Sequence, residues 1–397
     1  MTRVVVTGMG IISAAGKGCD ENIESLRKGN SGIGKASFFK SKYTSNFCFG
    51  EVKHSTENLI AVSQLNINDA YTRTDALAFY AFIEAIRDSG LSNYEVAGCD
   101  TAIISASTVG GMCAHGEMLH DVKPESSPSV LINSYSFAAH TLKIVNHYHA
   151  RGFSDTVNTA CSSSANAIIA GCRLIESGRV KRAIVGGVDS LSKYTVNGFN
   201  SLRILSDEPC RPFDINRKGL SLGEGAAYLV LESEELAVNK KIYAIVSGFA
   251  NVSDAFHQSS LSEDAKGVKL VMTKALQAAG LNPGQIQYIN AHGTGTENND
   301  KVELTGLSAV FGNIPFYNST KSYTGHTLGA AGAIEAVYSI FGMINGEIFP
   351  GLNCSDPISD FGNTPEMKHL TGIEINNVLS NSFGFGGNCS SLIFSKL

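Results

Sequence analysis

The residue that most directly offers chemistry in this sequence is Cys161, within VNTACSSSANAII at residues 157–169. A β-favouring run precedes it, and small hydroxylated residues follow it into a helical pattern that ends at Gly178. The thiol is therefore expected at a helix amino terminus, where unpaired N–H groups and the helix dipole lower the pKa of a thiol. On this stretch alone, a small buried cysteine beside a Ser-rich cap is an equal alternative.

Two histidines and a lysine could act with that thiol. His292 follows the apolar run IQYIN, and Lys321 and His326 precede a small-residue helix in NSTKSYTGHTLGAAG. A single histidine is more often structural than catalytic, and this holds for either one taken alone. Cys161 and both histidines, however, lie at the predicted ends of strands or helices, which can meet at one edge of an α/β fold. We therefore expect these side chains to converge.

The elements that must position these residues occur twice along the chain. RVVVTGMG at residue 3 is similar to YAIVSGFA at residue 243, and helical patterns ending at Gly90 and Gly280 are each followed by an apolar strand. We expect two similar halves, residues 1–235 and 236–397, packed into a layered α/β/α/β/α body with helices on both faces of the strands. Residues 30–70 lack a counterpart in the second half and are predicted to be an insertion that caps one face.

Composition argues against several classes of function. The 397 residues carry a formal net charge of -5 and no Lys/Arg tract, so no nucleic-acid partner is expected. No run reaches the roughly 18 apolar residues of a membrane span. The first strand is interrupted by Thr7, Gly8 and Gly10, unlike a signal peptide, and a cytoplasmic protein is expected. The nine cysteines include no Cys-x-x-Cys pair, and no metal site is predicted.

Five stretches in order resemble the motifs of the elongating β-ketoacyl-[acyl carrier protein] synthases: DTVNTACSSSANAI, RPFDINRKGLSLGEGAAYLVLE, NAHGTGTENNDKVE, STKSYTGHTLGAAGAIEA and NSFGFGGNCSSLIF. The resemblance implies the thiolase fold, an internally duplicated five-layered α/β/α/β/α body. It implies a homodimer, with a heterodimer with a related subunit as the alternative. It also implies a decarboxylative Claisen condensation of malonyl-carrier with an acyl chain, with an acyl carrier protein as partner. No cofactor is implied beyond the carrier's phosphopantetheine.

The resemblance also implies roles for individual residues. Cys161 would accept the acyl chain, and His292 and His326 would hold the malonyl thioester oxygen and stabilise the enolate. The backbone N–H groups of Cys161 and Phe385 would form the oxyanion hole. Lys321 and Glu335 match the family's buried pair behind the histidines, where an unpaired lysine would be costly.

Further positions carry weaker implications. Thr294 and Thr296 resemble the hydroxyls that bind the pantetheine amides, although loop threonines often serve only their own turn. The glycines around Phe383 and Phe385 suit a loop in which the Phe385 ring swings to admit acyl chains, and a ring buried in a tight turn is the alternative. Val109 matches a position that sets the depth of the acyl pocket, but a valine beside glycines is more often core.

The chain departs from the family pattern after the double glycine, where Asn388 and Cys389 replace the usual Thr-Asn. Hydrogen bonds behind the gating loop are therefore expected to differ, and the departures favour a specialised lipid pathway, such as a polyene or aryl one, over housekeeping fatty-acid synthesis. Two alternatives stay open. A coenzyme A-dependent thiolase would need a second catalytic cysteine in a Cys-x-Gly loop, which Cys389 fits poorly. A catalytically silent, chain-length-factor-like partner usually lacks the nucleophilic cysteine.

Overall fold

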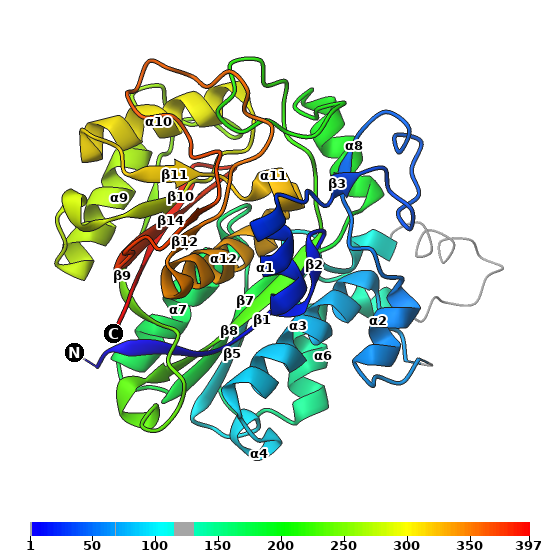
Figure 1. The fold of residues 1–397 in the computed structure, drawn as a ribbon. Helices are drawn as coiled ribbons and strands as arrows, with labels where there is room; N and C mark the ends of the chain where they lie inside the picture. Colours follow the sequence, from blue (N-terminus) through cyan, green and yellow to red (C-terminus); the bar gives the residue numbers. More distant parts are fainter. Residues whose placement is uncertain (1, 68, 115–130) are drawn as a thin grey trace.

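The strands follow the same order in both halves of the chain, as the computed structural model shows for residues 2–67, 69–114 and 131–397 (Figure 1). The first half has the order β6-β5-β7-β8-β1, and the second has β11-β10-β14-β15-β9. The first set is β1 (Val4–Ser13), β5 (Thr101–Ala106), β6 (Ser154–Val157), β7 (Arg182–Asp189) and β8 (Gly225–Ser233). The second set is β9 (Ala244–Ser253), β10 (Tyr288–Asn290), β11 (Phe316–Asn318), β14 (Asn377–Gly384) and β15 (Asn388–Ser395).

Strand direction repeats along with strand order. In the first half β5 pairs in parallel with β6 and β7, whereas β8 pairs antiparallel with β7 and β1. In the second half β10 pairs in parallel with β11 and β14, whereas β15 pairs antiparallel with β14 and β9. Every residue of β1, β5 and β8 is buried, which accounts for their continuous apolar runs. The internal duplication expected from the sequence is confirmed.

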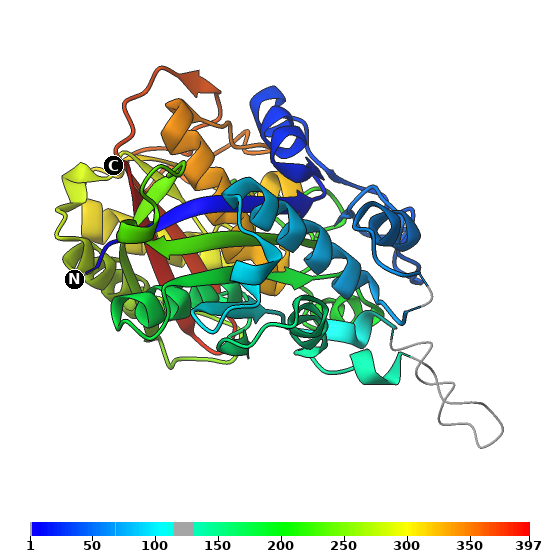
Figure 2. The same ribbon diagram turned by 90° about the horizontal axis from the view of Figure 1, so that it is seen from below.

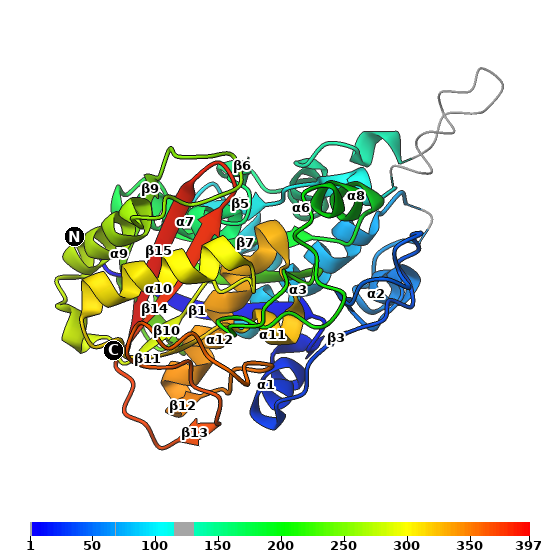
Figure 3. The same ribbon diagram turned by 90° about the horizontal axis from the view of Figure 1, so that it is seen from above.

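Helices cover the strands in three layers (Figures 2 and 3). The helix α3 (Arg73–Ser89) packs on β1 and β8, with α6 (Ala139–Tyr148) beside it. Between the halves lie α7 (Ser163–Glu176) and α12 (Ala331–Asn345), which contact each other and strands of both halves. The outer layer of the second half is α9 (Lys266–Ala279) with α10 (Glu297–Phe311). These layers are the expected α/β/α/β/α arrangement.

The two halves also meet edge to edge, which the sequence did not indicate. Antiparallel pairing of Val5 with Ile245 and of Val6 with Ala244 joins β1 to β9, so the strands form one 11-stranded sheet. This pairing gives backbone N–H and C=O groups partners that an open strand edge would leave unpaired. We propose that the first half ends at residue 235 and the second begins at residue 236. This boundary lies between β8 and β9, which supports the proposal.

The segment 30–70, described except for residue 68, adds β3 (Ile33–Gly34), β4 (Phe49–Gly50) and α2 (Thr56–Val62) outside the layers. Phe49 is in one apolar cluster with Leu222 and Leu328, and the Gly50 N–H donates to the Leu222 carbonyl at 2.9 Å. A Cβ on Gly50 would lie 1.8 Å from the Thr324 carbonyl oxygen, so only glycine permits this approach. The segment therefore braces the loop that precedes His326.

The remaining elements are short or peripheral: α1 (Gly18–Lys28), α4 (Asn93–Val96), α8 (Lys193–Ser201), α11 (Lys321–Thr324), β2 (Gly16–Lys17), β12 (Glu347–Ile348) and β13 (Leu370–Thr371). Residues Leu328–Asn345, which include α12, are long and apolar enough for a membrane span by composition alone. Most of that segment is buried inside the protein, as expected for a core helix.

Candidate active site

Cys161 lies in the turn between β6 and α7, directly before the helix cap Ser162. The preceding Ala160 has a φ of 53°, a left-handed conformation that is strained for alanine. The Ser163 hydroxyl accepts a hydrogen bond from the Thr159 N–H at 2.9 Å and fixes the turn. The sulfur thus lies at a helix amino terminus, and the residue is only 4% exposed.

The structure corrects the expected acidity of this thiol. Burial raises the pKa of Cys161 to about 11. The backbone N–H of Phe385 and the charge of Lys321 act in the opposite direction, and the nearby Asp189 raises the pKa further. The resting side chain is therefore a thiol whose deprotonation must accompany attack on a substrate. The sequence could not indicate this, because burial depends on how the two halves pack.

This acidity gives a pH prediction. The rate at which iodoacetamide alkylates Cys161 should keep rising between about pH 7 and about pH 10, because only the thiolate reacts. Peptide mass spectrometry measures the rate, and Cys161→Ser supplies the blank. A rate that levels off below about pH 8 would mean that local N–H groups and charges outweigh burial.

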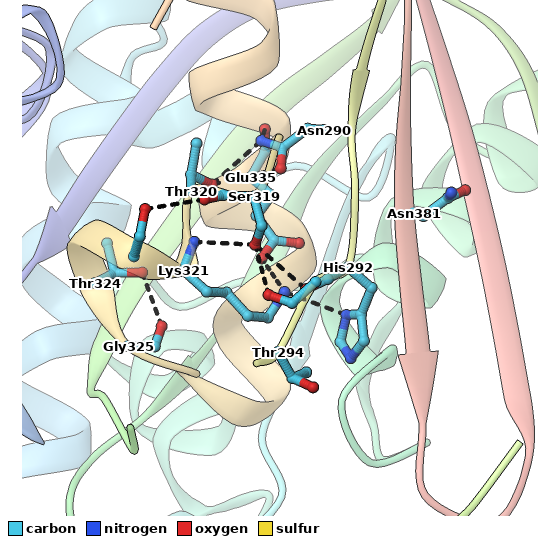
Figure 4. Close-up of polar contacts among 12 residues, drawn as sticks. Asn290, His292, Thr294, Ser319, Thr320, Lys321, Thr324, Gly325, Glu335 and Asn381 are labelled. Carbon is cyan, nitrogen blue, oxygen red and sulfur yellow. Dashed lines mark hydrogen bonds and ion pairs between the residues drawn. The ribbon is translucent and has the colours of Figure 1, made fainter. Parts of the chain in front are cut away.

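His292, Lys321 and Glu335 form a buried chain of polar contacts (Figure 4). The Lys321 Nζ lies 3.2 Å from the His292 Nδ1 and forms an ion pair with Glu335 Oε1. An ammonium can only donate, so the His292 Nδ1 accepts and its proton lies on Nε2. Burial lowers the pKa of His292 well below its ordinary value, and Lys321 and His326 lower it further. His292 is therefore neutral, with an N–H available at Nε2.

His326, on the loop after α11, lies beside the His292 ring. The two ring centroids are 5.3 Å apart, with the planes at 85°. The backbone N–H of His326 donates to the Ser221 carbonyl at 2.7 Å, and this bond fixes the loop. Burial lowers the pKa of His326 well below its ordinary value, so this ring is neutral too. Its Nδ1 has no hydrogen-bond partner among the residues that the structure describes.

The end of β14 connects the thiol with the histidines. The Phe383 ring lies 5.6 Å from the His292 ring, and a Cβ on the next residue, Gly384, would lie 3.2 Å from the Cys161 nitrogen. The following N–H, of Phe385, forms a hydrogen bond that lowers the pKa of the Cys161 thiol. The structure thus brings Cys161, both histidines and Lys321 together from separate stretches of sequence.

An open cavity of about 640 Å³ reaches His326 and the end of β14. Thr294, Thr296, His326, Phe383 and Phe385 are among the residues that line it. The hydroxyls of Thr294 and Thr296 lie 2.9 Å apart, so they bond to each other in this state. The ring of Phe385 stacks on Phe199 of α8, with centroids 5.6 Å apart and planes at 15°. A ring at the cavity wall is compatible with a gate.

Val109 is not among the residues that line this cavity. It is 4% exposed, and its N–H donates to Asp189 Oδ1 at 3.2 Å. Asp189 also accepts from the Thr108 and Gly329 N–H groups, at 3.0 and 2.7 Å to Oδ2. This buried carboxylate therefore holds the loop of Val109 against the segment after His326.

Two supporting acids were given no role from the sequence, although Glu303 ends the motif NAHGTGTENNDKVE and fits the family pattern there. Glu303 accepts from the backbone N–H groups of His292 and Gly293 at 2.9 and 2.8 Å and so orients the His292 loop. Burial raises its pKa to about 7, although these N–H groups lower it. Asp189 is the other acid. An acidic residue at the end of an apolar strand, as in IVGGVD, was the available signal for Asp189. For Glu303 the signal was its place in the motif, which did not indicate that it binds the His292 backbone.

Comparison with known proteins decides the family. Residues 1–237 match the family described as "Beta-ketoacyl synthase, N-terminal domain", and residues 243–355 match "Beta-ketoacyl synthase, C-terminal domain". The chain belongs to the β-ketoacyl synthase family. It is therefore a condensing enzyme, an acyltransferase with the thiolase-like α/β fold.

Relatives match this synthase over its full length. It is 33% identical to the 3-oxoacyl-[acyl-carrier-protein] synthase 2 of Vibrio harveyi, over 100% of this chain and 99% of that protein. Among solved structures, the ishigamide ketosynthase/chain length factor superposes with a TM-score of 0.93 at 30% identity, covering 100% of this chain and 99% of the other. A ketosynthase, ApeO, in complex with its chain length factor ApeC from Xenorhabdus doucetiae gives 0.86 at 30%, covering 100% and 98%.

Proposed function

We propose that this synthase condenses malonyl groups with an acyl chain held on Cys161, both delivered by an acyl carrier protein. The observation that carries the proposal is the convergence of the Cys161 thiol, the Phe385 N–H and the paired histidines near one cavity. Covalent attachment divides a difficult condensation into two steps.

In the first step the Cys161 sulfur attacks the carbonyl of an acyl-carrier thioester. The negative charge of the tetrahedral intermediate forms on the carbonyl oxygen, where the N–H groups of Cys161 and Phe385 would stabilise it. The carrier thiol leaves with the proton that the cysteine gives up. Since burial keeps Cys161 protonated, this proton transfer belongs to the acylation step and not to the resting enzyme.

In the second step malonyl-carrier loses CO2, and the resulting enolate attacks the acyl-cysteine. The enolate carries its charge on the thioester oxygen, which the Nε2–H of His292 and the ring of His326 would bind. Neutral rings suit this role because an uncharged imidazole already has an N–H that can donate a hydrogen bond to the enolate oxygen. Lys321 and Glu335 act through His292 by fixing its tautomer. Cys161 then leaves as thiolate and takes up a proton from water, because its original proton left with the first carrier thiol.

The direct test is incubation of purified protein with malonyl-carrier and acyl-carrier, with detection of CO2 and 3-oxoacyl-carrier. Comparing carriers that differ in chain length and unsaturation also tests the proposed specialised pathway, which is supported by the departures at Asn388 and Cys389. Full-rate elongation of ordinary saturated chains alone would argue against that pathway while leaving the condensation intact.

The histidines have a test of their own. His292→Ala and His326→Ala should each slow decarboxylation of malonyl-carrier by about 100- to 1000-fold, as loss of one oxyanion donor does elsewhere. The assay uses a Cys161→Gln background, in which we expect decarboxylation without condensation, because the glutamine occupies the acyl site while the histidines remain. His369→Ala is the control, because His369 pairs with Glu347 near β13, away from the cavity. An unchanged rate in either active-site variant would remove that ring from the mechanism.

The partner subunit is proposed from the edge of the sheet. In the described part of the chain β6 pairs only with β5, and Phe153 and Leu142 beside it are 49% and 56% exposed. An open strand with apolar neighbours favours pairing with a second subunit. We propose a homodimer, with a heterodimer with a related subunit as the alternative, in a cytoplasmic protein. Sedimentation distinguishes a monomer from a dimer, and co-expression with a related subunit distinguishes the two dimers.

The two competing functions fit less well. A silent partner needs no nucleophile, yet Cys161, both histidines and Lys321 are all present and adjacent. A thiolase needs a second cysteine in the site, but Cys389 is fully buried in β15 with its sulfur on the Gly387 carbonyl at 3.6 Å. Intact mass after incubation with acyl-carrier separates the cases, since a silent subunit gains no acyl adduct.

A further inference from the structure

Asn388 connects the two segments that carry the proposed oxyanion donors. It is the first residue of β15, three positions after Phe385. Its side-chain oxygen accepts three hydrogen bonds, from the Ser162 hydroxyl at 2.7 Å, the Asn166 amide at 2.9 Å and the Asn251 amide at 2.7 Å. Ser162 and Asn166 lie on the first turns of α7, directly after Cys161.

The other bonds of this cluster strengthen the same connection. The Asn166 amide also donates to the Thr159 hydroxyl at 2.8 Å, on the other side of Cys161. The Ser390 hydroxyl donates to the Asn166 side-chain oxygen at 2.8 Å, so β15 holds this asparagine at two points. Asn251 is exposed and can turn to water, but the Ser162 and Asn166 donors are partly buried, and without the Asn388 oxygen their remaining acceptors lie on Thr159. Loss of that oxygen would therefore remove the link from α7 to β15 through Asn388 and leave one donor hydrogen of Asn166 unsatisfied.

The geometry of the oxyanion hole depends on this connection. The β14 backbone approaches the nucleophile turn so closely that a Cβ on Gly384 would lie 2.6 Å from the Thr159 carbonyl oxygen. Phe385 follows in a turn closed by the Gly387 N–H on the Gly384 carbonyl at 3.1 Å, and Asn388 comes next. The turn that contains Phe385 is therefore held at both ends. Gly384, at its start, touches the turn that contains Cys161, and Asn388, just after it, is bonded to α7.

We propose that Asn388 is a positioning residue that sets the separation of the Cys161 and Phe385 N–H groups. The inference rests on the proposed function. It states that the oxyanion hole and the histidine pair are held in place by different residues. Asn388 fixes the oxyanion hole, whereas Lys321 and Glu303 fix His292 and the Ser221 carbonyl fixes the His326 loop. Two donors that are misplaced even slightly stabilise a developing charge less well.

The test measures the two steps separately in Asn388→Leu, which keeps the size of the side chain and removes the acceptor. Acyl transfer from acyl-carrier to Cys161, followed by intact mass, should slow by about 10- to 100-fold. Decarboxylation of malonyl-carrier, followed in a Cys161→Gln background, should change by less than about 2-fold, because it depends on the histidines. Asn388→Asp restores the acceptor and should recover most of the acyl transfer.

Asn251→Leu is the matched control. It removes the donor on β9 but leaves the bonds from Asn388 to Ser162 and Asn166, so acyl transfer should stay near the wild-type rate. If Asn388→Leu folds poorly, Asn388→Ala gives the same ratio of rates. Equal slowing of both steps, or slowing of neither, overturns the positioning role alone. Wild-type protein that performs neither step overturns the proposed function, and this inference with it.

Discussion

Replacement of Cys161 by alanine is expected to abolish condensation, with a loss of roughly 10,000-fold or more, as removal of a covalent nucleophile does elsewhere. The reason is that Cys161 is the thiol that the Phe385 N–H contacts, and the Lys321 beside His292 also acts on it. Liquid chromatography of the 3-oxoacyl-carrier product measures the loss, and intact mass should show no acyl adduct.

The matched control is Cys172→Ala, the same change within α7, the helix that follows Cys161. Cys172 is fully buried in the core, where burial raises the pKa of its thiol, and it plays no part in the proposed chemistry. This variant should retain condensation while losing some stability to the small cavity. A Cys161→Ala protein that still forms product would disprove covalent catalysis at this position.

Replacement of Lys321 by alanine is expected to lower the free energy of unfolding by about 3–5 kcal/mol, because it leaves a buried carboxylate without its partner. The side chains of Lys321 and Glu335 are only 1% and 3% exposed, and one oxygen of Glu335 has no hydrogen-bond partner among the described residues. The variant should also lose decarboxylation, since His292 would no longer be held in the Nε2–H tautomer. Urea denaturation and the malonyl assay measure the two effects.

The sign of the pH dependence follows from burial. Burial raises the pKa of Glu335, and Lys321 opposes that rise. Without Lys321 the pKa of Glu335 in the folded protein rises further above its value in the unfolded chain. Above that unfolded pKa the unfolded chain therefore ionises more readily, which lowers the free energy of unfolding. The stability deficit of Lys321→Ala should therefore shrink as the pH falls toward the unfolded pKa of glutamate.

Removal of both partners, in Lys321→Met with Glu335→Leu, separates structure from chemistry. The double variant should recover much of the lost stability, because well-packed apolar side chains often replace a buried ion pair at little cost. It should not recover decarboxylation. Recovery of both would mean that the pair has no influence on His292.

Local patterns in the sequence predicted much of this fold, because apolar runs ended by glycines determine the elements. Gly90 and Gly280 end α3 and α9 with φ of 69° and 67°, and each adopts the left-handed conformation that the pattern requires. The positions of Cys161, His292 and His326 at element ends were also readable. Their roles came from resemblance to a family and not from spacing.

Features that depend on packing between distant segments could not be predicted. The pairing of Val5 with Ile245 is not evident in either strand, since any apolar strand has the same open edge. The acidity of Cys161 depends on its burial and on the Phe385 N–H and the Lys321 charge, which come from distant parts of the sequence. Glu303 is one of several acids on α10, and only its side-chain direction distinguishes it.

The divided origin of the site has a consequence for protein synthesis. Cys161 leaves the ribosome well before His292 and His326, and the Phe385 N–H emerges after all three. A nascent chain that carries only the first half has the sulfur and the Cys161 N–H but lacks the Phe385 N–H, Lys321 and both histidines. The complete arrangement of thiol, oxyanion donors and histidines therefore exists only after the second half has docked.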